Sequence, residues 1–239
     1  MPSSSIIVLM TQKIILRIAA IISGISGIVI LTGVIYPIVS YNSTYSQNYT
    51  KLISPISGTM EKVQGAVTTS TTTGSKVDYT QASTWFPGGA KKEDFSNSKV
   101  DYYNITIPKL KINSMSVAIG GEDLSKSLIQ YPGTALPGKR GNSVIFGHSI
   151  LPIFYDPKNY ISIFSLLPTL KNGDLIYINY DGVSYTFRIE TMFEVLPTDI
   201  QVLDQDSTDS FLTLVTCVPP GDPSKPKRLI VRARVVPPQ

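Results

Sequence analysis

The sequence is poor in the side chains that build disulfides and metal sites: Cys217 is its single cysteine and His148 its single histidine. A single cysteine excludes an intramolecular disulfide. One cysteine and one histidine are too few for a metal site built on a Cys/His cluster. An unpaired thiol outside the cytoplasm is buried and inert, an intermolecular link or a reactive nucleophile. The surroundings of Cys217 must decide among these three.

Charged residues are also scarce, at 16% of the chain, and the net charge is only +4. The basic residues are scattered and form no Lys/Arg stripe interleaved with aromatic residues, so a nucleic acid is not expected as a partner. The 239 residues fit one ordinary domain plus an appendage. A hydrophobic fraction of 42% and a mean hydropathy of +0.12 indicate that part of the chain sits in lipid.

The longest stretch without a charge is Ile18–Ser40. Its 23 residues suffice to cross the roughly 30 Å hydrocarbon layer as a helix. A cleaved secretory signal is the alternative, but its apolar region usually covers only about 7–15 residues and no A-x-A-like site follows here. Lys13 and Arg17 precede the stretch, and the next charge is Lys51. The positive-inside rule therefore predicts a single-pass protein of the cell membrane with residues 1–17 in the cytoplasm.

Residues 41–99 are rich in Ser, Thr, Asn, Tyr and Gly and show no sustained helical or strand period. This composition predicts a flexible extracytoplasmic linker. Within it, Trp85-Phe86-Pro87 is the one segment expected to dock on the following domain, and it is a candidate lid. Pro37 is expected to end or kink the preceding helix near the outer membrane boundary.

Residues 100–239 change to short β-rich runs separated by Gly, Pro, Asn and Asp, which is typical of an antiparallel barrel or sandwich. Asp181-Gly182 is a strong hairpin signal between the runs 175–180 and 183–196. Short helices are expected over Glu122–Ile129 and Ile161–Leu167. The other predicted strands are Tyr102–Ile107, Ser114–Ala118, Ser143–Gly147, Phe211–Cys217 and Arg228–Val236.

Two of the predicted strands end at the lone thiol and the lone imidazole. Cys217 closes the run Phe211–Cys217, and His148 follows the run Ser143–Gly147, so both stand where side chains can reach a cleft. A thiol is a nucleophile only as thiolate, and a neighbouring histidine can exchange its proton and protonate a leaving amine. By residue type alone, a packing role for the cysteine and a structural role for the histidine remain the commoner outcomes.

Several segments resemble the sortase family. Thr213-Leu214-Val215-Thr216-Cys217 resembles its TLxTC signature, and Arg228-Leu229-Ile230-Val231 resembles the arginine-bearing strand that follows. Residues 131–138 and 142–149 resemble the GTALPG…GNxVIxGH segment, and residues 107–112 resemble the IPKIxI entry strand. These blocks stand in the family's order between about residues 105 and 236.

The resemblance implies an all-β fold with a sortase-type barrel of about eight strands and a catalytic domain over residues 100–239. It also implies cleavage of an LPxTG-like sorting signal at the end of secreted proteins. Cys217 would be the nucleophile, His148 the general acid and then base, and Arg228 the cation that steadies the oxyanion. Thr216 would add a hydroxyl or backbone contact. The acceptor would be an amine, such as a peptidoglycan precursor or a pilin lysine.

Arg228 has two competitors on its own strand. Arg232 and Arg234 share its face, and a row of arginines is usually a solvated exterior. Arg228 is favoured because it lies nearest the loop that follows Cys217.

No cofactor is expected. The acidic segment Pro197–Ser210 matches the loop that helps sortases read the signal peptide, and it carries Asp199, Asp204, Asp206 and Asp209. A solvated loop is the favoured interpretation, and a calcium site, as in some family members, is the alternative.

The sequence has no Asp-Pro-aromatic lid motif of the pilin-polymerising class before the barrel, which favours a housekeeping or accessory anchoring enzyme. Two alternatives of other classes stay open. A non-catalytic sortase-like surface module predicts a disrupted Cys–His–Arg set, and a hydrolytic cysteine peptidase would use water as the acceptor.

Overall fold

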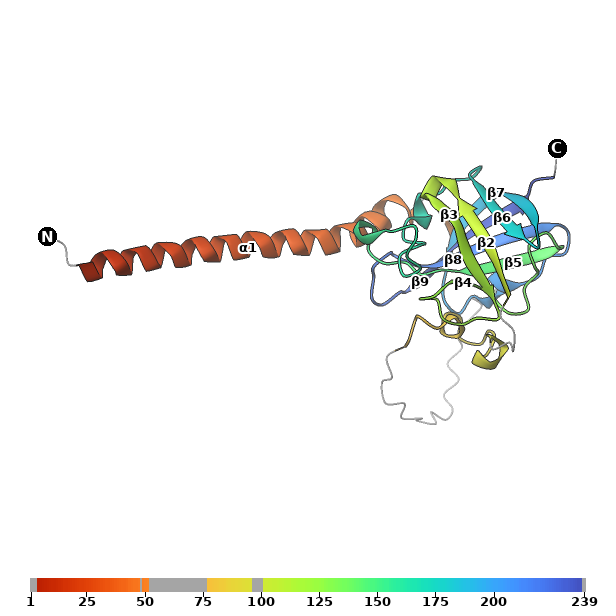
Figure 1. The fold of residues 1–239 in the computed structure, drawn as a ribbon, viewed down its shortest axis with the longest axis horizontal. Coiled ribbons are helices and arrows are strands. Elements are labelled where there is room, and N and C mark those ends of the chain that lie inside the picture. Colours follow the sequence, from red (N-terminus) through yellow and green to blue (C-terminus); the bar gives the residue numbers. More distant parts are fainter. Residues whose placement is uncertain (1–3, 48, 52–76, 96–100, 238–239) are drawn as a thin grey trace, which may run out of the picture.

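The structure is a computed structural model, and it describes residues 4–47, 49–51, 77–95 and 101–237. One long helix, α1 (Ser4–Thr44), extends away from a β-barrel, as Figure 1 shows. About half of the predicted linker, residues 48, 52–76 and 96–99, lies outside the described residues. The division of the chain at residues 17, 40 and 99 therefore stays a prediction.

Eight strands close into a barrel in the order β7-β6-β2-β3-β4-β5-β8-β9, and β9 pairs back with β7. The short strand β1 pairs in parallel with the end of β7. The strands are β1 (Thr50–Lys51), β2 (Asp101–Ile107), β3 (Ile112–Ile119), β4 (Leu128–Gln130), β5 (Gly141–Phe146), β6 (Leu175–Tyr180), β7 (Val183–Val195), β8 (Ser210–Val218) and β9 (Lys227–Val235). The predicted all-β class with an eight-stranded barrel is confirmed.

Among the described residues, the helices other than α1 are short 3₁₀ turns outside the strands. They are η1 (Ala82–Thr84), η2 (Lys92–Phe95), η3 (Pro108–Leu110), η4 (Pro152–Phe154), η5 (Leu167–Thr169) and η6 (Ile200–Leu203). The predicted helices at Glu122–Ile129 and Ile161–Leu167 are wrong. Residues 128–130 pair as β4 between β3 and β5, and residues 160–166 are turns. Pairing with strands distant in sequence outweighs the local apolar spacing here.

Side chains of the barrel wall alternate between two apolar clusters, as the period of a strand requires. In β8, Leu214 and Val218 belong to the cluster that fills the barrel, whereas Val215 and Cys217 belong to a second cluster. Residues 78–95, called the cover below, supply Ala82, Trp85, Phe86 and Phe95 to this second cluster. The second cluster therefore lies on the outer face of the wall, between the barrel and the cover.

The predicted docking of Trp85-Phe86-Pro87 is confirmed for Trp85 and Phe86, which are 0% and 2% exposed, whereas Pro87 is exposed. The cover is the yellow segment beside the barrel in Figure 1. Its backbone pairs with residues 122–124, because Ala82 N donates to the Glu122 carbonyl at 3.1 Å and Leu124 N to the Thr80 carbonyl at 2.9 Å. This part of the predicted flexible linker is packed against the barrel.

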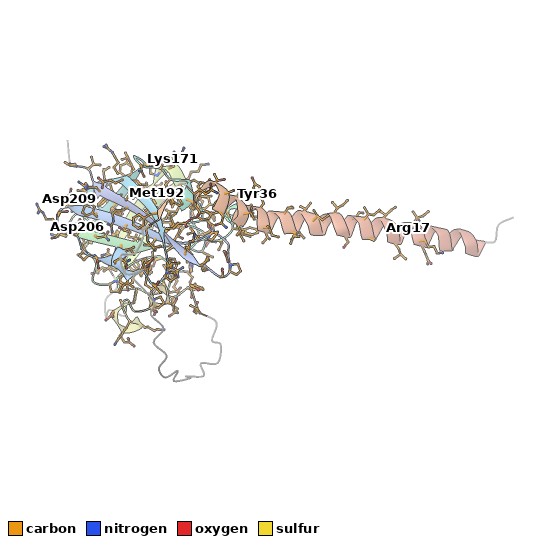
Figure 2. The ribbon with its side chains drawn as sticks, turned by 180° about the vertical axis from the view of Figure 1, so that it is seen from behind. Arg17, Tyr36, Lys171, Met192, Asp206 and Asp209 are labelled. Carbon is orange, nitrogen blue, oxygen red and sulfur yellow. The ribbon has the colours of Figure 1, made fainter. Side chains whose placement is uncertain are left out.

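Helix α1 runs beyond both ends of the predicted segment 18–40, and Pro37 lies inside it. One bond lost at the proline does not end a helix whose flanking turns stay bonded. Gln12–Thr44 is long and apolar enough to cross a membrane. The helix meets the barrel near Tyr36, which Figure 2 labels, and ends at Thr44.

A buried carboxylate ties the end of α1 to the barrel. Tyr41 Oη donates to Glu194 Oε1 at 2.7 Å, and Ser46 Oγ donates to Glu194 Oε2 at 3.0 Å. Lys227 Nζ lies 2.7 Å from the same Oε2. Since Glu194 lies in β7 and Lys227 in β9, these bonds hold α1 against two strands of the barrel.

Candidate active site

Cys217 and Arg228 are direct cross-strand partners in the antiparallel pair of β8 and β9. Directly opposite residues point to the same face, with their Cβ atoms about 4.5–5.5 Å apart. The competing arginines pair further along the ladder, Arg232 with Thr213 and Arg234 with Phe211. Arg234 also forms ion pairs with Glu190 and Asp209. Of the three arginines, Arg228 is therefore the one beside the thiol.

His148 approaches Cys217 from the other side of β8. Strands β5 and β8 run parallel, with Phe146 opposite Val215, and Gly147 N donates to the Val215 carbonyl at 3.1 Å. Two residues further along both chains, His148 stands level with Cys217. Ser149 Oγ donates to the Cys217 carbonyl at 2.6 Å and fixes this register. The thiol is thus flanked by the imidazole on one side and the guanidinium on the other.

The glycine before His148 is required by close packing. A Cβ at Gly147 would lie 2.4 Å from Phe164 Cδ2 and 2.5 Å from Leu128 Cδ2. No side chain fits at such distances. On the other side, Phe164 N donates to the His148 carbonyl at 2.9 Å, so the backbone that carries the imidazole is fixed by residues from three parts of the chain.

Thr216 lies on the face opposite to the thiol, because neighbouring residues of a strand alternate. Its hydroxyl is fully buried and donates to the Gly147 carbonyl at 2.8 Å. The predicted role of Thr216 stays a prediction, and the geometry favours a positioning role. The hydroxyl holds the backbone of Gly147, directly before His148, against β8.

The guanidinium of Arg228 is buried, at 1% exposure. Nη1 donates to the carbonyls of Lys225 and Lys227 at 2.9 and 3.2 Å, and Nη2 donates to the Trp85 carbonyl at 3.0 Å. Its Nε has no hydrogen-bond partner. Within the described ranges, no carboxylate lies within ion-pair distance of Arg228. A buried cation without a counter-anion stabilises any negative charge that forms nearby.

Trp85 of the cover packs over both partners of the thiol. Its ring lies 5.8 Å from the His148 ring, and Arg228 Cζ lies 5.5 Å from the Trp85 ring. The ring also stacks on Phe146 at 5.1 Å. His148 is 4% and Cys217 1% exposed. Because the thiol lies outside the barrel and beneath the cover, moving the cover would expose it without opening the barrel.

Burial keeps the Cys217 thiol and the His148 imidazole neutral in this arrangement. Burial raises the pKa of the Cys217 thiol, and the positive charges of Arg228 and Lys225 partly oppose this shift. Burial lowers the pKa of His148 to about 4, and the Lys225 charge acts in the same direction. At neutral pH the closed site therefore holds a thiol and a neutral imidazole.

This shift makes His148 a source of acid sensitivity. The unfolded chain protonates His148 at its usual pKa of about 6.5, whereas the folded chain does so only near 4, so stability is lost as the pH falls between these values. From pH 7 to 4.5 the free energy of unfolding is expected to fall by roughly 2 kcal/mol through this residue. Urea titrations at the two pH values should therefore show that the free energy of unfolding falls by that much less in His148→Gln than in the unaltered chain. An equal loss in both chains would contradict the assignment.

Lys225 is a residue of the site that the sequence analysis did not identify. It lies in the loop between β8 and β9, its Nζ lies 4.7 Å from the centre of the Tyr79 ring of the cover, and its carbonyl accepts from Arg228. It is the second cation whose charge acts on Cys217. A lysine in a loop rich in Gly and Pro carries no local pattern that could have indicated this.

The acidic loop predicted to read the signal peptide contributes η6 to the second cluster through Val202. Asp206 accepts from Thr208 and Asp209 accepts from Ser210, and Asp209 also forms an ion pair with Arg234. In the part of the chain that the structure describes, no group of three His, Cys, Asp or Glu side chains is placed to hold a metal ion. The absence of a cofactor and the alternative of a calcium site both stay predictions.

The sortase domain family model matches residues 105–236. Sortase A of Streptococcus agalactiae is 29% identical over 132 residues, which cover 55% of this chain and 51% of that protein. Sortase A of Staphylococcus aureus is 29% identical over 143 residues, covering 53% and 66%. The chain thus spans about half the length of the first of these relatives.

A solved structure supports the same relationship. The structure of a lid mutant of sortase A from Corynebacterium diphtheriae superposes with a TM-score of 0.51 and 28% identity, over 60% of this chain and 74% of that one. The family model covers more than half of the chain and includes Cys217, His148 and Arg228. The chain therefore belongs to the sortase family.

Proposed function

We propose that the chain is a membrane-anchored cysteine transpeptidase that needs no cofactor. It cleaves an LPxTG-like sorting signal in a secreted protein and transfers that protein to an amine, such as a peptidoglycan precursor or a pilin lysine. One observation carries the proposal: the single thiol of the chain is flanked by the buried imidazole of His148 and the buried guanidinium of Arg228. His148 Nε2 and Arg228 Nε are both buried without a hydrogen-bond partner. Unpartnered buried polar atoms are rare unless a ligand or a reaction uses them.

In the first half of the reaction, His148 takes the proton of Cys217, and the thiolate attacks the threonine carbonyl of the signal. The carbonyl oxygen gains a negative charge that Arg228 stabilises. The C–N bond then breaks, and His148 gives its proton to the departing glycine amine. In the second half an incoming amine attacks the thioester, loses its proton to His148 and expels the Cys217 sulfur.

The cover acts as a lid in this proposal. In the closed arrangement Trp85 fills the space above His148 and Arg228, so a peptide reaches the thiol only when the cover moves. Opening also returns water to the site, which brings the pKa values of thiol and imidazole closer to their usual values and to each other.

Helix α1 is the anchor in this proposal. Lys13 and Arg17 precede its apolar part, so the positive-inside rule places the N-terminus in the cytoplasm and the barrel outside. Substrates that have crossed the membrane would then meet the catalytic domain on its outer side.

The test uses the full chain in lipid nanodiscs with a library of LPxTG-like peptides, with and without oligoglycine or a diaminopimelate-type amine. We expect an acyl adduct on Cys217 by mass spectrometry and a ligated product that needs the amine. Cys217→Ala should give neither. Cleavage with water alone as acceptor would support the peptidase alternative, and no adduct across the library would support the non-catalytic surface module.

A further inference from the structure

Two large apolar side chains project from the loop that follows His148. Ile153 is 64% and Phe154 62% exposed, and both lie in η4. Single exposed apolar residues are ordinary, but an adjacent pair at a loop tip indicates a surface that is covered in use. Residues 151–155 are called the apolar tip below.

The apolar tip lies beside α1. A cavity of about 280 Å³ is lined by Tyr36, Pro37 and Ser40 of the helix and by Pro152 and Ile153 of the tip. In Figure 1 the loops that follow β5 surround the barrel end of α1, and in Figure 2 Tyr36 marks this junction. The tip is therefore level with the last turns of the apolar stretch.

That level is the outer boundary of the membrane. A helix rises 1.5 Å per residue, so about 20 residues cross the roughly 30 Å hydrocarbon layer. Counted from Ile18, the first residue after Arg17, these residues end at Pro37. Tyr36 is 72% exposed here, and tyrosine is enriched at this boundary. Ile153, which shares a cavity with Tyr36 and Pro37, lies at the same depth.

The apolar tip is held in place. Tyr155 Oη donates to the Leu110 carbonyl, and Ile150 N donates to Ser165 Oγ at 2.9 Å. On the opposite side, Gly221 of the loop between β8 and β9 packs closely on Leu151. A Cβ atom at Gly221 would lie only 2.5 Å from Leu151 Cδ2. The bonds of Glu194 fix α1 to the barrel as well. The tip and the helix are therefore parts of one rigid arrangement.

We propose that Ile153 and Phe154 insert into the outer interface of the membrane that α1 spans, as a second membrane contact of the protein. The inference rests on the proposed anchor, because the depth of the tip is measured along α1. Membrane lipid is the proposed partner because Ile153 and Phe154 lie beside residues of α1 that the membrane span places at the lipid surface. The contact would hold the loop after His148 against the bilayer, so that the end of the barrel that carries the catalytic residues faces the membrane.

The test is tryptophan quenching by lipids brominated in their acyl chains, using full chains in phosphatidylcholine vesicles. Phe154→Trp, Tyr36→Trp and Val183→Trp are compared with the unaltered chain, whose Trp85 is fully buried. Val183 is 49% exposed and serves as the control far from the membrane. Phe193, near the other end of β7, pairs with Thr50 of the segment that follows α1. Val183 lies ten residues from Phe193 along β7, which corresponds to about 33 Å. We expect Phe154→Trp to lose at least about a third of its added emission and Val183→Trp to lose none.

The outcomes separate the two proposals. If Tyr36→Trp is quenched and Phe154→Trp is not, the anchor stands and the second contact is overturned. If neither is quenched, both are overturned. A blue shift of Phe154→Trp without quenching would mean that protein covers the tip, and it would also overturn the lipid contact.

Discussion

Replacing Trp85 with alanine is expected to make the Cys217 thiol react with iodoacetamide at least about 30-fold faster at neutral pH. Truncating a buried tryptophan costs about 3–5 kcal/mol, and each 1.4 kcal/mol is a factor of ten in an equilibrium. If roughly 2 kcal/mol of this lost free energy weakens the docking of the cover, the fraction of molecules with the cover open rises about 30-fold. The Trp85 ring packs on Phe146, His148 and Arg228.

Two control variants show that the effect belongs to the cover. Trp85→Phe keeps an aromatic ring at the place where Trp85 packs on Phe146, His148 and Arg228, so it should react only a few-fold faster. Tyr102→Ala removes a ring that is 62% exposed and should change nothing. The thermal midpoint of the barrel is measured beside each rate, since unfolding would also expose the thiol. A folded Trp85→Ala chain with an unchanged rate would contradict the lid.

Replacing Arg228 with lysine is expected to lower the rate of acyl transfer by about 10²- to 10³-fold, the loss typical of removing an oxyanion donor. The guanidinium donates to three backbone carbonyls with its two Nη atoms, and its buried Nε has no hydrogen-bond partner. A single ammonium group keeps the charge but cannot reproduce this planar arrangement of donors. The measurement is the single-turnover rate of adduct formation with an LPxTG-like peptide.

Arg232→Lys is the matched control for this prediction. Arg232 lies on the same face of β9, four residues further along, where it donates to Thr213 and to the Val202 carbonyl. It should change the rate by no more than about threefold if only the cation beside the thiol matters. Equal losses in the two variants at equal thermal stability would sink the assignment of Arg228.

The sequence alone determined most of the strands and the family. The alternation along residues 183–196 and 228–236 fixes a period of two, and that period survives folding because each strand has one face on the barrel interior. The blocks around His148 and Cys217 placed the two groups at strand ends, which is where β5 and β8 end. The resemblance carried the roles of these residues, and those roles stay predictions.

Only the tertiary structure decided which groups meet. Arg228, Arg232 and Arg234 share one sequence pattern, and the register of β9 on β8 is what sets Arg228 opposite Cys217. Apart from Trp85-Phe86-Pro87, the cover has the composition of a flexible linker, because its order comes from contacts with residues far away in sequence. For the same reason residues 128–130 became a strand between β3 and β5 rather than part of a helix. Local sequence fixes periodicity, whereas register and docking depend on long-range pairing that no short pattern contains.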